Sequence, residues 1–113
     1  MDVEKIRNIC LGKPGTTEDM KWGDHLCFCV AGKIYLILGM DDHPVTASVK
    51  VTDDEFETWS RREGFVPAPY MARNKWVKMD DLERLGEKEW RERIEISYDI
   101  IRSKLPKKIQ ASL

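Results

Sequence analysis

The chain has 113 residues, of which 42% are hydrophobic and 35% are charged, and its formal net charge is −1 at pH 7. This length fits one domain that can bury an ordinary hydrophobic core. The net charge excludes a global field that would draw the protein onto nucleic acid or an anionic membrane, and no apolar run reaches the roughly 18 residues of a membrane-spanning helix.

The N-terminus and the cysteines both favour a cytoplasmic protein. The polar start at Met1 lacks the basic segment and the apolar core of a signal peptide. The three cysteines, Cys10, Cys27 and Cys29, are few and odd in number, unlike the disulfide framework of a small secreted domain. We therefore expect these thiols to be reduced, buried and packed as small hydrophobic residues.

The first predicted element is a helix over residues 2–11. Asp2 is a suitable N-cap, and Gly12 followed by Pro14 is a typical stop. Apolar side chains recur at helical spacing at Val3, Ile6, Ile9 and Cys10. This stripe predicts that one face of the helix packs on the core.

Strands dominate the middle of the chain. Residues 18–22 form a weak strand candidate, and two apolar runs over residues 25–30 and 33–40 flank Ala31-Gly32, which predicts a β-hairpin with a tight turn. Both runs are apolar at nearly every position, so we expect both of their faces to be partly covered. Residues 45–51 alternate apolar and polar side chains and give the clearest strand pattern.

A second helix and two extended segments follow. Thr52 and Glu55 match a capping box, and Gly64 ends the helix that they begin. Residues 65–70 contain two prolines and are therefore predicted to be extended. Residues 74–79 form the last predicted strand.

A long final helix is predicted over residues 87–104. Its apolar side chains recur at steps of three and four at Trp90, Ile94, Tyr98 and Ile101. Pro106 stops this helix, and residues 107–113 are expected to be a frayed tail.

These elements predict an α+β fold in a single domain over residues 1–106. Short loops join the strands, so the sheet should be mostly antiparallel, with about five strands. Helices are expected at both chain ends, and one more between strands.

Charge is unevenly distributed along the chain. Residues 1–60 hold 6 Lys and Arg against 11 Asp and Glu, whereas residues 61–113 hold 13 against 9. The segment over residues 102–108 has four positive charges and no acid. Two interpretations stay open, a solvated helix end whose cations complement the helix dipole and a patch that contacts an anionic ligand.

The segment over residues 69–78 mixes three cations with two large aromatic side chains. Such a mixture can hold phosphate groups while a ring stacks on a base or a sugar. A structural interpretation is also open, in which Trp76 is a core residue and Tyr70 closes a sheet edge. Trp22 and Trp59 carry the same ambiguity and favour the core.

His25, Cys27 and Cys29 are spaced to share one strand face, and zinc accepts imidazole and thiolate ligands. Only His43 remains as a second imidazole, and structural zinc sites pair their ligands across turns, so packed cysteines are favoured over a metal site. A nucleophilic thiolate needs a lowered pKa, which an apolar strand does not provide. We expect no catalytic residue, no metal and no cofactor.

Several motifs occur in a specific order along most of the chain. They are Pro14-Gly15 after the first helix, Trp22-Gly23, Gly32-Lys33-Ile34-Tyr35, Phe65-Val66-x-x-Pro69-Tyr70, Lys75-Trp76-Val77 and Ser97-Tyr98-x-x-Ile101-x-x-Lys104-Leu105-Pro106. In this order the chain resembles the MmcQ/YjbR family of small bacterial proteins, over residues 2 to about 109.

The resemblance implies a CyaY-like (frataxin-like) fold and a DNA-binding protein with a "double wing" arrangement. The positions that match the family's signature are Lys33, Lys50, Tyr70, Lys75, Trp76, Tyr98 and Lys104. The chain departs from the commoner pattern at Pro69, where many relatives have Gly, and at Lys75, where many have His. A role that needs that imidazole as a base is therefore put in doubt, whereas a role that needs a cation is retained.

We expect a binding protein, because no pair of titratable groups has a recognisable catalytic spacing. The first hypothesis is DNA binding through a basic and aromatic surface made of Lys50, Tyr70, Arg73, Lys75, Trp76, Lys78, Lys104, Lys107 and Lys108. The alternative is a module that binds a small anionic ligand or a protein partner, with no role in nucleic-acid binding. A membrane partner is not expected.

Overall fold

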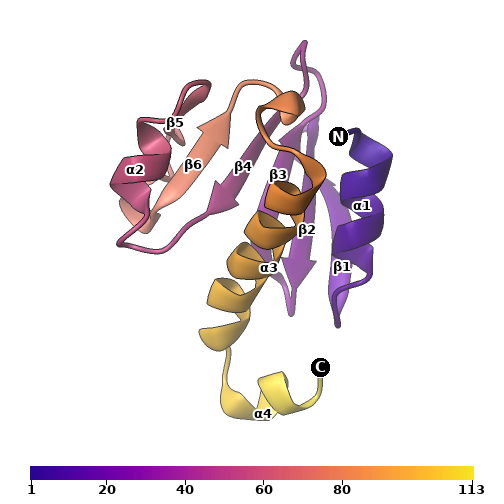
Figure 1. Cartoon of the computed structure of the whole chain (residues 1–113). Helices are drawn as coiled ribbons and strands as arrows, with labels where there is room; N and C mark the ends of the chain where they lie inside the picture. The colour runs from indigo at the N-terminus through magenta and orange to yellow at the C-terminus, as the bar shows by residue number, and fades with distance from the viewer.

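The computed structural model describes all 113 residues and consists of one antiparallel sheet with helices packed on one of its faces (Figure 1). The six strands lie in the order β1-β2-β3-β4-β6-β5. The elements are α1 (Val3–Leu11), β1 (Thr16–Lys21), β2 (His25–Val30), β3 (Lys33–Gly39), β4 (Thr46–Lys50), α2 (Phe56–Ser60), β5 (Phe65–Pro67), η1 (Ala72–Asn74), β6 (Trp76–Met79), η2 (Leu82–Arg84), α3 (Glu87–Ser103) and α4 (Lys107–Ala111). No helix is both long and apolar enough to cross a membrane.

The predicted α+β class and the antiparallel sheet are confirmed. The sheet has six strands where about five were expected, because part of the extended segment over residues 65–70 pairs with β6 as the short strand β5. The first strand begins at Thr16 and ends at Lys21, so Trp22 lies in the turn that follows it and not in the strand.

The main core lies between the sheet and the helices α1 and α3. Trp90, Ile94 and Tyr98 of α3 and Ile6 of α1 are buried there against the inward side chains of the strands. The indole N–H of Trp90 donates a hydrogen bond to the carbonyl of Leu82 at 2.8 Å. The helical spacing read from the sequence therefore identifies the buried faces of both helices.

A β-bulge in β3 turns two consecutive side chains toward this core. Phe28 is paired with Leu36 and Cys29 with Ile34, so Tyr35 is the extra residue in the ladder. The Tyr35 ring packs edge-on against Tyr98 with centroids 5.3 Å apart, and its hydroxyl donates to the carbonyl of Cys10. The bulge thereby links the sheet to both α1 and α3.

The opposite face of the sheet is covered only in part, by the chain's own residues 68–75. A second, smaller apolar cluster forms under this segment and consists of Cys27, Cys29, Ile37, Ala68 and Trp76. Burial raises the pKa of the Cys27 thiol to about 11 and that of the Cys10 thiol to about 12. The cysteines are free, buried and protonated at neutral pH, as the sequence predicts.

The expected frayed tail is instead a docked helix. Residues 107–111 form α4, and the guanidinium of Arg102 donates to the carbonyl of Gln110 at 3.0 Å. The amide of Gln110 in turn donates to the carbonyl of Leu105 at 2.7 Å, and Leu113 packs against the main core. These contacts join residues on both sides of Pro106. The sequence of the tail alone does not indicate them.

Ser97 joins α3 to two strands in the centre of the core. Its hydroxyl donates to the carbonyl of Tyr35 in the bulge and accepts from the backbone N–H of Lys50 at 3.1 Å. The side chain is fully buried, so water cannot replace either partner.

Replacing Ser97 by Ala should lower the free energy of unfolding by about 2–3 kcal/mol, because a buried donor and a buried acceptor lose their partner. Chemical denaturation measures the change. Ser103→Ala is the matched control, since this exposed hydroxyl on the same helix donates only to the carbonyl of Ile100, and its effect should stay within about 0.5 kcal/mol. Equal effects of the two substitutions would contradict the bridging role of Ser97.

Candidate functional site

The residues predicted to form one surface are separated by the fold into five places. Lys50, Lys75 and Lys104 come together where β4, β6 and α3 meet. Tyr70 and Lys78 line a pocket on the partly covered sheet face. Arg73 is exposed on η1, Lys107 and Lys108 are exposed on α4, and Trp76 is buried.

The first place, which we call the basic corner, consists of Lys50, Lys75 and Lys104. Lys50 is the last residue of β4 and is paired with Trp76, so it lies beside Lys75 at the start of β6. Lys104 directly follows the C-terminal end of α3. Lys50 is only 5% exposed, and its ammonium donates a hydrogen bond to the carbonyl of Asn74.

The electrostatics of the basic corner are unfavourable for the positive charge of Lys50. Burial lowers the pKa of Lys50, and the ammonium groups of Lys104 and Lys75 lower this pKa further, whereas the Asp53 carboxylate acts in the opposite direction. None of the three lysines has a carboxylate oxygen within 4.0 Å. The corner therefore holds positive charge that no ion pair within 4.0 Å compensates, and Asp53 opposes it only from a longer distance.

Lys75 is held toward the corner by its backbone conformation and by an aromatic ring. Its φ is +63°, in the left-handed region that a lysine seldom occupies. Its ammonium lies 5.0 Å from the ring centroid of Phe56 on α2, a distance typical of a cation–π contact. The residue thus occupies a strained position that its local sequence alone would not favour.

Trp76 does not contribute to a binding surface. Its side chain packs on Cys27, Cys29 and Ile37, and the residue is only 5% exposed. Stacking on a base needs an exposed ring face, so the hypothesis that Trp76 stacks on a ligand is wrong, and the core interpretation holds. The ring supports the segment over residues 68–75 from below.

The second place, which we call the open-face pocket, has a volume of about 520 Å³. It lies beside residues 68–71 and is lined by Trp22, His25, Ile37, Ser48, Tyr70, Met71 and Lys78, among others. Tyr70 is fully exposed and Trp22 is 67% exposed, although the sequence analysis favoured a core position for Trp22. The Gly directly after Trp22 was the signal that this ring lies in a turn.

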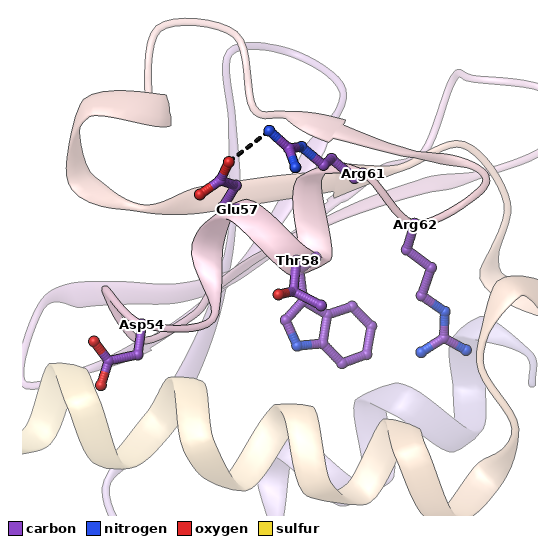
Figure 2. Close-up of a pocket in the computed structure, with 6 residues that line it drawn as sticks. Asp54, Glu57, Thr58, Arg61 and Arg62 are labelled. Atoms are coloured by element: carbon purple, nitrogen blue, oxygen red, sulfur yellow. Dashed lines mark ion pairs between the residues drawn. The ribbon is translucent and has the colours of Figure 1, made fainter.

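A third hollow lies over α2, where Asp54, Glu57, Thr58, Arg61 and Arg62 surround Trp59 (Figure 2). Its charges are largely compensated within the chain. Arg61 forms an ion pair with Glu57, and Arg62 pairs with Glu89 at 2.8 Å while its guanidinium lies 4.8 Å from the Trp59 ring centroid. Surface pairs of this kind leave little free charge for a ligand.

Comparisons with known proteins identify the sequence family and the fold. A model of the YjbR family matches residues 11–100. A crystal structure of a Deinococcus radiodurans protein with a DUF419 domain aligns with a TM-score of 0.87 at 19% identity, over 97% of this chain and 86% of that one. A crystal structure of a Pseudomonas syringae protein aligns with a TM-score of 0.72 at 22% identity, over 88% of this chain and 98% of that one. At these identities the two structures show the fold alone, and the expected likeness to CyaY stays a prediction.

Replacing Lys50 by Met should raise the free energy of unfolding at neutral pH, because the folded state disfavours the Lys50 ammonium. A lowered pKa means that the unfolded chain binds the proton more tightly, so the wild-type protein gains stability as pH rises through the folded-state pKa. The advantage of the variant should therefore shrink toward pH values of about 10.4, where lysine titrates in the unfolded chain.

Denaturation curves over a series of alkaline pH values measure this dependence. Lys33→Met is the matched control, because Lys33 is exposed as the first residue of β3. Its effect should stay within about 0.5 kcal/mol. A Lys50→Met variant that is equally destabilised at every pH would show that the contact with Asn74 outweighs the charge repulsion.

Proposed function

The chain belongs to the YjbR family, and from this premise we propose that it is a binding protein that holds a phosphate-bearing ligand in the basic corner. One observation carries the proposal. Three lysines from three distant parts of the chain meet there without a carboxylate partner within 4.0 Å. Among the lysines of the protein only Lys13 and Lys21 have a carboxylate oxygen within 4.0 Å, so the corner is set apart by the meeting of three unpaired lysines.

A doubly charged anion would remove the electrostatic cost of bringing these lysines together. An ammonium group has three donors, and Lys50 uses one of them on Asn74, so its remaining donors are free for phosphate oxygens. Hydrogen bonds between charged partners are about twice as strong as neutral ones. Binding would also raise the lowered pKa of Lys50, because the anion favours its protonated form.

The phosphate group has two possible sources, a small molecule and the backbone of DNA. The basic corner is compact, and the net charge of −1 with the acidic N-terminal half of the chain favours a small ligand over a polyanion. The positions of Lys107 and Lys108 favour DNA as the source, because both are exposed on α4 shortly after Lys104. A duplex would need these cations in addition to the corner.

The proposal predicts that inorganic pyrophosphate binds the wild-type protein and that Lys50→Met and Lys104→Met each weaken binding at least about tenfold, which is about 1.4 kcal/mol. Isothermal titration calorimetry measures the affinity. Lys88→Met, at an exposed position on α3 outside the corner, is the matched control and should bind like the wild type.

The same titration with a short DNA duplex, at about 50 mM and about 200 mM salt, distinguishes the two sources. Tighter binding of the duplex than of pyrophosphate, weakened by Lys107→Met and Lys108→Met, would assign the phosphate to DNA. Binding of neither probe at low salt would overturn the proposal.

The lowered pKa of Lys50 gives the site a distinctive pH dependence. Sulfate keeps its charge throughout the alkaline range, so its affinity should fall with pH as Lys50 loses its proton, starting below the ordinary lysine value of about 10.4. Lys50→Arg should move this fall to higher pH, because arginine keeps its proton to about pH 12. An unchanged profile in Lys50→Arg would exclude Lys50 as the titrating contact.

A further inference from the structure

We propose that the open-face pocket is a second binding site, separate from the basic corner, and that it binds a small planar aromatic anion between Trp22 and Tyr70 with its charged group on Lys78. The site does not depend on phosphate binding. Four features of the pocket carry the inference: its floor, its two exposed rings, its charge and its size.

The floor is a continuous row of side chains across the sheet. Ile37 of β3 is paired with Ser48 of β4, and Ser48 is paired with Lys78 of β6. Side chains directly opposite each other on neighbouring strands point to the same face. The row therefore presents an apolar group, a hydroxyl and an ammonium side by side, and Met71 from the segment above adds a second apolar wall.

The two rings belong to residues whose backbone conformation disfavours a bulky side chain. Trp22 has φ +53° and Tyr70 has φ +64°, both in the left-handed region. This conformation is unfavourable for a residue other than Gly, Asn or Asp. Trp22 and Gly23 both have a positive φ in the three-residue turn, Trp22-Gly23-Asp24, that joins β1 to β2.

Neither ring packs in the core, so hydrophobic burial does not offset the backbone strain. Tyr70 is fully exposed and Trp22 is 67% exposed, and Trp22 contacts the edge of His25 with centroids 5.8 Å apart. An exposed aromatic ring in a strained backbone position points to a functional role, since strain persists where the function uses it. Stacking of each ring on an aromatic ligand would stabilise the bound state.

The charge of the pocket selects an anion. Lys78 is its only lysine or arginine, and it has no carboxylate oxygen within 4.0 Å. No carboxylate lines the pocket. Two acids lie next to lining residues: Oδ1 of Asp24 is 2.7 Å from Nδ1 of His25, and Oδ2 of Asp42 accepts a hydrogen bond from the Thr46 hydroxyl at 2.7 Å.

The size and shape of the pocket select a small planar ligand. A volume of about 520 Å³ lies within the range of roughly 300–1,000 Å³ that small-molecule sites occupy. Two exposed rings beside a flat strand surface accommodate a planar ring system, and one ammonium accommodates one carboxylate or similar group. An aromatic carboxylate has this combination of features.

The test uses naphthoate as the probe and the neutral naphthyl alcohol as its counterpart, with amide NMR shifts of the labelled full-length protein. We expect naphthoate shifts to centre on Trp22, Ser48, Tyr70 and Lys78, and the alcohol to bind at least about tenfold more weakly. Lys78→Met should abolish this preference for the anion, whereas Lys33→Met, remote from the pocket, should preserve it.

Two substitutions separate binding from folding. Trp22→Asn and Tyr70→Asn remove a ring while supplying a residue that tolerates the left-handed conformation. Each should weaken naphthoate binding at least about tenfold, with thermal stability unchanged or raised. Ala31→Asn makes the same conformational change at φ +49° in the turn between β2 and β3, outside the pocket. This control should raise stability and leave the affinity unchanged.

The results that overturn the proposal are specific. Naphthoate affinity that is unchanged in both Trp22→Asn and Tyr70→Asn would exclude the two rings as ligand contacts. Concentration-dependent dimerisation that these two substitutions abolish would make a second copy of this chain the occupant. Single-stranded DNA could displace naphthoate from the pocket. If it did so with a higher affinity than that of naphthoate, the occupant would be a nucleobase. Lys50→Met should still bind naphthoate. This result would show that the open-face pocket binds its ligand independently of the basic corner, so the two proposals can fail separately.

Discussion

The structure depends on how the second face of the sheet is covered. The helices bury one face only, yet β2, β3 and β6 carry apolar side chains on both faces. Cys27, Ile37 and Trp76 would be exposed to water unless part of the chain folded over them. Residues 68–75 do so, and the N–H of Ala68 fixes this segment by donating to the carbonyl of Trp76 at 2.9 Å. The segment covers only part of this face, and the open-face pocket lies beside it.

Both proposed sites lie at the ends of this covering segment. Tyr70 at one end lines the open-face pocket, and Lys75 at the other end belongs to the basic corner. Each of the two residues is in a left-handed conformation, and the pairing of Lys50 with Trp76 holds the second end against β4. The burial of Trp76 thus stabilises the covering segment and offsets the backbone strain of Tyr70 and Lys75. The same packing that covers the sheet positions both sets of candidate ligand contacts.

The placement of unpaired lysines, and not net charge, distinguishes the candidate sites: three lysines meet in the basic corner, and one lies beside two exposed rings in the open-face pocket. The overall charge of −1 indicates no preference for anions. Most arginines pair with a carboxylate, as Arg93 does with Glu55 at 2.8 Å, whereas most lysines do not. Lys50 and Lys78 have no such partner and face different ends of the same sheet surface. A field focused by unpaired groups acts over a short range, since salt screens exposed charges within about 8–10 Å. Both sites are therefore suited to small ligands that contact the lysines directly.

The sequence by itself determined the order of the main helices and strands, because secondary structure follows largely from local patterns, but it did not reveal α4 or the pairing of β5. The alternation over residues 45–51 and the helical spacing over residues 87–104 reflect which side chains face the core within one element. The tertiary structure alone decided that Trp76 is buried and Trp22 exposed, and that Lys50 and Lys104 meet. Burial of a ring depends on which distant segment packs over it, and the approach of two cations depends on where their strands and helices end in space. No pattern within a window of neighbouring residues carries that information, since the contacts join residues far apart in the chain.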